Sequence, residues 1–206
     1  MAMRWLWSSS YTINIEYMIK FDKEVEQFLP YNRKKYKSGK GWFGVSFQLP
    51  GVFEGVDIGL EKYLESYENW FKNIISKLDN DSLWVVNHDI IDNHWFPNEE
   101  NNLNNLRVLF KQNNISNSFV GALLFTTDDL LKFAKDLISY PYAVINKKGH
   151  LYANLDISIK EQPFVIKISG HLCIDILSTN KEFLRQIVRE NSSSIFIVRN
   201  YNNTLF

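Results

Sequence analysis

Residues 139–180 read SYPYAVINKKGHLYANLDISIKEQPFVIKISGHLCIDILSTN and carry the clearest strand pattern of the chain. Turn residues divide this segment into three apolar runs, 140–146, 151–159 and 164–177. In the second run Leu155 and Ile157 alternate with Asp156, and a period of two is typical of a strand with one buried and one solvent-facing side. The short turns contain Asn, Gly and Pro, which favours an antiparallel meander over residues 141–178.

Further strands and helices are expected before and after this meander. Alternating apolar residues predict strands at 11–21 and 42–49, and helical spacing predicts helices at 60–78, 127–139 and 180–190. The sequence therefore predicts an α+β fold, with a mainly antiparallel sheet, a C-terminal meander and three or more helices packed on it. The side chains expected in the core are Phe133, Leu137, Leu155, Ile157, Ile166 and Ile168.

The length of 206 residues suits one domain, and residues 1–206 are assigned to it. The alternative is a sub-boundary near Pro97, where an acidic region ends. Cys173 is the single cysteine of the chain, so no internal disulfide can form and a reducing, cytoplasmic location is expected. No apolar run approaches the length that spans a bilayer, so no membrane partner is expected.

Charge is distributed unevenly, although the net charge of the chain is zero. Residues 1–53 carry a net charge of +4, residues 54–100 a net charge of −8, and residues 101–206 a net charge of +4. The basic stretch 32–40 is expected to be a solvated loop. A balanced protein with an acidic middle third lacks the surface of a general nucleic-acid binder, so no nucleic-acid partner is expected. The acidic third indicates instead a negative surface for a basic protein partner.

The acidic third concentrates its charge on one predicted helix and the loop after it. Three glutamates share the solvent-facing side of helix 60–78, and the simplest interpretation of such a stripe is a solvated face. The loop 79–97 adds acidic residues and two tryptophans, which are frequent anchors of interfaces. The candidate partner-binding residues are Glu61, Glu65, Glu68, Asp79, Asp81, Trp84, Asp89, Asp92 and Trp95.

One dense group of metal-ligand side chains occurs in the chain. The run HDIIDNH contains His88, Asp89, Asp92 and His94, and imidazole and carboxylate groups are ligands of zinc and iron. These four residues define the alternative function, a metal-dependent hydrolase. A polar loop whose histidines form local hydrogen bonds explains the same residues, so no metal, cofactor or catalytic residue is expected.

The size, the α+β pattern and the uneven charge together resemble the immunity proteins of bacterial polymorphic toxin systems. The resemblance extends over the whole chain and rests on the acidic residues and tryptophans named above, without a diagnostic motif. It implies a cytoplasmic, non-catalytic binding protein that neutralises a cognate toxin by direct protein–protein contact, as in a toxin–antitoxin pair. A structural or regulatory domain with a different partner is the third interpretation.

Overall fold

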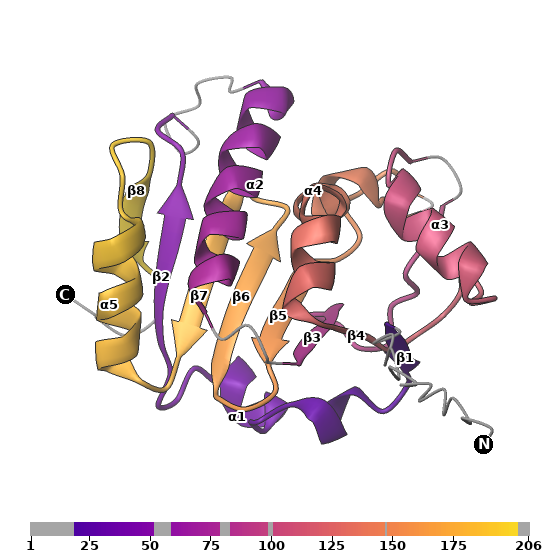
Figure 1. The fold of residues 1–206 in the computed structure, drawn as a ribbon, viewed down its shortest axis with the longest axis horizontal. Helices are drawn as coiled ribbons and strands as arrows, with labels where there is room; N and C mark the ends of the chain where they lie inside the picture. The colour runs from indigo at the N-terminus through magenta and orange to yellow at the C-terminus, as the bar shows by residue number, and fades with distance from the viewer. Residues whose placement is uncertain (1–18, 52–58, 79–82, 99–100, 147, 202–206) are drawn as a thin grey trace, which may run out of the picture.

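An antiparallel sheet forms the centre of the molecule, and helices cover one of its faces (Figure 1). The computed structural model describes residues 19–51, 59–78, 83–98, 101–146 and 148–201. Its strands are β1 (Lys20–Asp22), β2 (Phe43–Gln48), β3 (Trp84–His88), β4 (Ala122–Phe125), β5 (Leu155–Ile159), β6 (Phe164–Ser169), β7 (Cys173–Ser178) and β8 (Ile197–Asn200). Its helices are the 3₁₀ helix η1 (Val25–Phe28) and the α-helices α1 (Arg33–Lys37), α2 (Leu60–Lys77), α3 (Asn104–Gln112), α4 (Thr127–Ala143) and α5 (Lys181–Asn191). The strand order β1-β4-β3-β5-β6-β7-β2-β8, with antiparallel pairs, confirms the predicted α+β fold.

The C-terminal meander is present, but it begins later than predicted. It consists of β5, β6 and β7, and the third apolar run, 164–177, contains two of these strands. The first run, 140–146, was expected as a strand, and this prediction is wrong because α4 continues to Ala143. A short apolar run does not distinguish helix from strand. Tyr140 lies one helical turn after Leu137 and is equally buried, so it extends the inward face of α4.

The main core lies between the sheet and the helices α2, α4 and α5, which correspond to the three predicted helices. Helix α4 begins with a capping box, in which the Thr126 hydroxyl accepts a hydrogen bond from the N–H of Asp129 and the Asp129 carboxylate accepts from the N–H of Thr126. The six side chains predicted for the core are all buried. Packing against these helices therefore fixes one face of the sheet.

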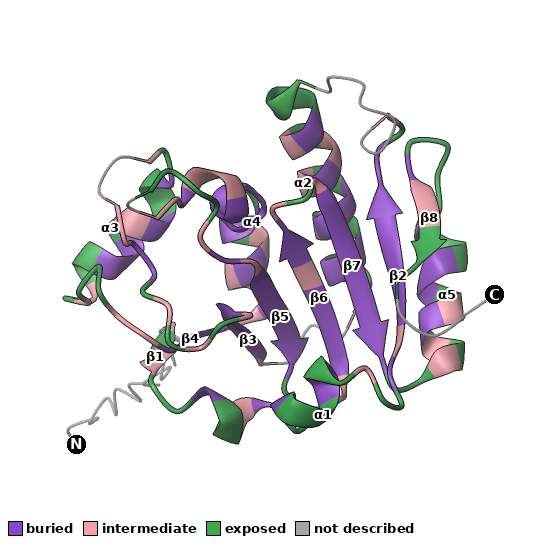
Figure 2. Cartoon of the chain, turned by 180° about the vertical axis from the view of Figure 1, so that it is seen from behind, coloured by how far each residue is buried: buried purple, intermediate pink, exposed green. Residues whose placement is uncertain are grey.

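The opposite face of the sheet is covered at one end by the segment that contains η1 and α1 (Figure 2). The basic stretch 32–40 includes α1, because Asn32 caps its first turn, and it is not the loop that was expected. Tyr36 of α1 is buried against Leu177 of the sheet. Asp156 was expected to face solvent, but it is 0% exposed. The prediction of a solvent-facing side for β5 is therefore wrong at this residue.

Both sides of the suggested boundary near Pro97 contribute strands to the one sheet. Strand β3 pairs with β5, and β2 pairs with β7. The predicted strand 11–21 lies mostly outside the described residues, which include its end at the start of β1. Within the described residues, no helix has the length and apolar character needed to cross a membrane.

Candidate functional site

A line of polar side chains crosses the sheet on the face opposite α2, α4 and α5. Cross-strand register aligns one residue from each of six neighbouring strands: Asn87, Asp156, Lys167, Asp175, Ser46 and Arg199. Directly opposed residues on neighbouring strands point to the same face of a sheet. The residues that alternate with them along β5, β6 and β7 belong to the core beneath the helices. We call these six residues the polar row.

The two aspartates of the polar row are removed from solvent. Asp156 is 0% exposed and Asp175 is 2% exposed. Tyr36 belongs to a buried cluster on this face of the sheet that includes Leu177, two residues from Asp175 on the same side of β7. Burial of a carboxylate is costly, and strongly perturbed charged groups cluster at functional sites. The polar row is therefore the candidate functional site.

Neither aspartate has a complete set of hydrogen-bond partners. Both carboxylate oxygens of Asp156 and the Oδ1 atom of Asp175 are buried without a hydrogen-bond partner among the described residues. Hydrogen bonding from the Ser46 hydroxyl and the Cys173 thiol favours the charged form of the Asp175 carboxylate and so acts to lower its pKa. A buried acceptor without a donor costs about 1–3 kcal/mol, so a ligand that brings donors is stabilised at these atoms.

Burial raises the pKa of the carboxyl groups of Asp156 and Asp175 from 3.8 to about 6. At Asp156 the positive charges of Lys167 and Arg33 oppose the effect of burial. Burial lowers the pKa of the Lys167 ammonium group, but the charges of Asp156 and Asp89 outweigh it, so that pKa is raised. At neutral pH the site therefore holds a charged lysine between two carboxylates that are mostly ionised.

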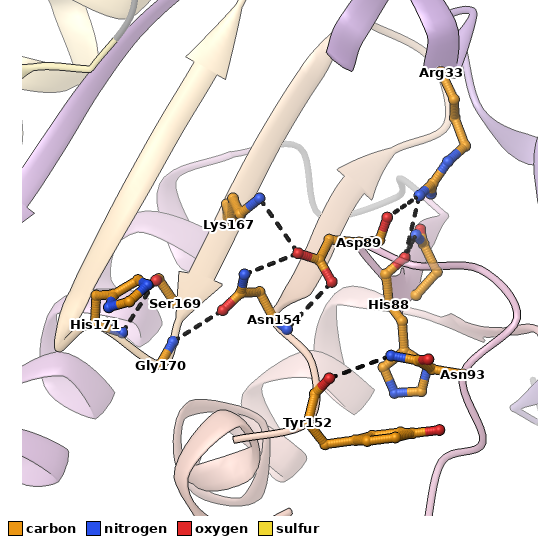
Figure 3. A network of polar contacts seen from close by, with 11 residues as sticks. Arg33, His88, Asp89, Asn93, Tyr152, Asn154, Lys167, Ser169, Gly170 and His171 are labelled. Atoms are coloured by element: carbon orange, nitrogen blue, oxygen red, sulfur yellow. Dashed lines mark hydrogen bonds and ion pairs between the residues drawn. The ribbon is translucent and has the colours of Figure 1, made fainter. Parts of the chain in front are cut away.

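Lys167 is held by an acidic residue outside the polar row (Figure 3). Its Nζ atom lies 3.6 Å from Oδ2 of Asp89. Asp89 also accepts hydrogen bonds from Asn154, at 3.3 Å from the backbone N to Oδ1 and at 2.8 Å from Nδ2 to Oδ2. Asn154 Oδ1 in turn accepts from the N–H of Gly170 at 3.0 Å. Lys167 thus forms its ion pair with Asp89 rather than with the aspartates of the row.

Arg33 ties α1 to the same corner of the sheet (Figure 3). Its Nη2 atom donates to the carbonyl oxygens of His88, at 3.3 Å, and Asp89, at 2.7 Å, where β3 ends. The Arg33 side chain is 4% exposed. Helix α1 thereby places a buried positive charge near Asp156.

Two adjoining cavities open onto the polar row. A cavity of about 350 Å³ is bounded by Asp156, and a cavity of about 450 Å³ is bounded by Asp175. Lys167 and Tyr201 line both cavities, so the two are neighbours, and we call them together the two lobes of the polar cleft. Its size is within the usual range of small-molecule sites.

Tyr201 reaches across the sheet because β2 has a glycine beneath it. The N–H of Tyr201 donates to the carbonyl oxygen of Gly44 at 2.9 Å. A Cβ atom at Gly44 would lie only 3.1 Å from a ring carbon of Tyr201, a close approach that favours glycine. The small residue thus allows the aromatic ring to lie at the division between the two lobes.

The cleft is better suited to binding than to nucleophilic attack by its cysteine. Cys173 lines the lobe that contains Asp175. Burial raises the pKa of the Cys173 thiol to about 11, and the charge of Asp175 acts in the same direction. Because the thiolate is the nucleophilic form, Cys173 stays an unreactive thiol at neutral pH.

The three glutamates predicted to bind a partner lie on α2, on the other side of the sheet from the polar cleft. Glu61 and Glu65 are exposed. Glu68 is half-buried, and its Oε1 atom lies 2.6 Å from Nζ of Lys72. Two of the three side chains are therefore free to meet a partner without breaking this ion pair.

The four aspartates predicted to bind a partner do not form one surface with these glutamates. Asp89 lines the polar cleft and takes part in the network around Asn154. Asp92 is exposed in the turn after β3. Asp79 and Asp81 lie outside the described residues.

Both tryptophans predicted to anchor a partner are fully buried, so that prediction is wrong for the folded protein. Trp84 Nε1 donates to Thr127 Oγ1 at 3.1 Å, and Trp95 Nε1 donates to the carbonyl oxygen of Gly121 at 3.0 Å. Each indole nitrogen thus has an internal partner, as buried tryptophans usually do. These side chains stabilise the core and are not available at the surface.

The structure does not bring His88, Asp89, Asp92 and His94 together. His88 points toward the helices, where its Nε2 atom is 2.7 Å from the Tyr140 hydroxyl, and burial lowers its pKa to about 4. His94 and Asp92 are exposed, while Asp89 belongs to the polar cleft. Within the described ranges no group of three or more His, Cys, Asp or Glu side chains is placed to hold a metal ion. The hydrolase alternative therefore lacks an assembled site among these four residues.

The polar row was not among the residues predicted from the sequence, although the sequence contains a signal for it. Each strand of the meander carries one charged residue between apolar neighbours, Asp156 in LDI, Lys167 in IKI and Asp175 in IDI. In one strand this pattern is typical of a solvent-facing side. Its recurrence at opposed positions of three successive strands indicates a charged line across the sheet.

Comparison with known proteins does not assign a role to these residues. Comparison of the chain with protein-family models, with curated proteins and with solved structures finds no match in any of the three. A function is therefore inferred from the residues and their geometry alone.

Proposed function

We propose that the protein is a non-catalytic binding protein, a cytoplasmic immunity protein that neutralises a cognate toxin domain by direct contact. The partner is expected to be basic, because residues 54–100 carry a net charge of −8. The observation that carries the proposal is the surface at the N-terminal end of α2. There, exposed glutamates and exposed apolar side chains occur together.

The start of α2 carries exposed glutamates, here called the acidic border, and contributes Lys62 and Ser66 to a neighbouring groove. Leu60 is 50% exposed and precedes the exposed Glu61, and Glu65 follows one helical turn later. A groove of about 350 Å³ is lined on one side by Lys62 of α2 and on the other by Ile195, which is 52% exposed. We call Leu60, Glu61, Glu65 and Ile195 the α2 surface. Apolar contacts surrounded by polar groups are the usual anatomy of a protein interface.

The two kinds of side chain have different roles in such an interface. Negative charges at the border attract a basic partner and mainly raise the association rate. Apolar side chains that become buried on contact mainly lower the dissociation rate. Because the tryptophans are internal, lasting contact is expected from Leu60 and Ile195.

Reversal of the border charges is expected to slow association. In Glu61→Lys/Glu65→Lys the association rate with a basic partner should fall about tenfold, because local attraction becomes repulsion. Glu61 lies in the first turn of α2, so its reversal also costs up to about 1 kcal/mol of folding stability. The measurement is stopped-flow or surface-plasmon kinetics against the purified product of the adjacent gene, at low and high salt.

The matched control is Glu26→Lys/Glu161→Lys, which reverses two exposed glutamates on η1 and on the β5–β6 turn. This control has the same change in net charge and should lose far less of the association rate. Equal losses in both variants would show that only net charge matters, and an unchanged rate in the α2 variant would remove the α2 surface from consideration.

A further inference from the structure

The unpartnered polar atoms around the polar row are nearly all hydrogen-bond acceptors. They are both oxygens of Asp156, Oδ1 of Asp175, Oδ1 of Asn87 and Oε1 of Gln48. Asn87 lies opposite Asp156, and Gln48 lies two residues from Ser46 on the same side of β2. Arg33 Nη1 is the one unpartnered donor that the described residues add at this corner. Unpartnered acceptors therefore outnumber unpartnered donors among the described residues of the site, so a ligand that brings donors is stabilised here.

The two lobes of the polar cleft each present one of these carboxylates. Asp156 lines the first lobe and Asp175 the second, and they stand two strand spacings apart, about 10 Å. Lys167, between them, forms its ion pair with Asp89 at 3.6 Å. Lys167 is therefore directed to Asp89, and among the described residues neither Asp156 nor Asp175 forms an ion pair. At longer range Lys167 acts on both carboxylates and Arg33 acts on Asp156.

Aromatic rings border both carboxylates. Tyr36 lines the first lobe, and Tyr201, which is 42% exposed, lines both. The face of an aromatic ring attracts a cation, and a carboxylate beside it adds a charge-assisted hydrogen bond. Positive side chains line the cleft as well, Lys37 in the first lobe, Arg199 in the second and Lys167 in both. The preference for a cation therefore rests on the unpartnered carboxylate oxygens rather than on the net charge of the cleft.

We propose that the polar cleft binds an organic cation, through a primary ammonium or guanidinium group that donates hydrogen bonds to Asp156 or Asp175. Such a group occurs on free amines and on the lysine and arginine side chains of proteins. The site lies on the sheet face opposite α2, so it is independent of the α2 surface. It gives the buried carboxylate oxygens hydrogen-bond donors that the described residues do not supply.

The test uses agmatine, which carries a guanidinium and an ammonium group, in calorimetric titrations at neutral pH. Agmatine should bind the wild-type protein, and Asp156→Asn and Asp175→Asn should each weaken binding about tenfold or more, because a charge-assisted hydrogen bond is lost. Butanediol and inorganic phosphate should not bind. Glu61→Lys/Glu65→Lys should bind agmatine like the wild type, which separates this site from the α2 surface.

Absence of agmatine binding would overturn the proposal, as would full affinity in both asparagine variants. Binding of phosphate or butanediol as tight as that of agmatine would also overturn it. The source of the cation is distinguished by a capped Gly-Arg-Gly peptide. Binding of this peptide at the affinity of agmatine assigns the site to a protein side chain, and its exclusion assigns the site to a free amine. Both outcomes support a cation site.

Discussion

Asp156→Asn is expected to make the protein more stable at neutral pH, by up to about 3 kcal/mol in the free energy of unfolding. Burial raises the pKa of Asp156 from 3.8 to about 6, so the folded state binds this proton more tightly than the unfolded state. The resulting stability is fully present below pH 3.8 and is lost as the pH rises through about 6. Asparagine has no such proton, so the variant does not undergo this loss.

Subtracting the two unfolding free energies isolates this effect from other titrations. Burial lowers the pKa of His88 to about 4, so His88 contributes stability that is present above its unfolded pKa of 6.5 and lost as the pH falls through about 4. That opposite trend occurs in both proteins and cancels in the difference. The asparagine amide group at position 156 needs hydrogen-bond acceptors, and a lack of them reduces the stability gain of Asp156→Asn by an amount that does not change with pH.

Urea denaturation at several pH values provides the measurement. The advantage of Asp156→Asn should grow by about 2 kcal/mol between pH 4 and pH 7. Asn87→Ser changes a buried neighbour that does not titrate, so its stability difference should not depend on pH in this way. A difference for Asp156→Asn that is also constant with pH would mean that the carboxylate is not destabilised by burial.

Trp95→Ala is expected to cost about 3–5 kcal/mol of folding stability. The indole is fully buried, and its ring centre lies 4.6 Å from that of His88 and 5.2 Å from that of Tyr140. Its removal leaves a cavity and takes away the donor to the Gly121 carbonyl oxygen. Chemical denaturation measures the loss, and Ile90→Ala, at a residue 53% exposed, should change stability by less than about 0.5 kcal/mol.

The same variant separates a structural role of Trp95 from a role in partner binding. Under conditions where Trp95→Ala is still folded, its dissociation rate from a partner should match that of the wild type. Unchanged stability together with faster dissociation would instead place the indole at an interface, which its burial contradicts.

The elements with a clear period could be predicted from the sequence, and the covering of the sheet could not. Alternation in β5 and helical spacing in α2 are local signals that survive in the fold. The solvent-facing side assigned to Asp156 was wrong because the segment that contains η1 and α1 covers this face of the sheet, and that segment is more than a hundred residues away in sequence. Contacts between such distant segments leave no trace in the period of either one.

Prediction of the candidate site from the sequence would also have required knowledge of contacts between distant segments. Asp156, Lys167 and Asp175 can be recognised as charges inside apolar strands, but their alignment requires the strand register. The tryptophans illustrate the opposite error, because their frequency at interfaces suggested exposure whereas their size suits the core. Composition alone does not separate these two uses of an aromatic side chain.

The central claim is that the fold holds a buried carboxylate at position 156 without its donor, ready for an organic cation. Its most direct test is the pKa of Asp156, measured from the carboxyl ¹³C chemical shift with and without saturating agmatine. The predicted value is about 6 in the free protein, and agmatine should lower it by at least about one unit, because a cation favours the charged form. A pKa near 3.8 in the free protein, or one that agmatine leaves unchanged, would contradict the claim.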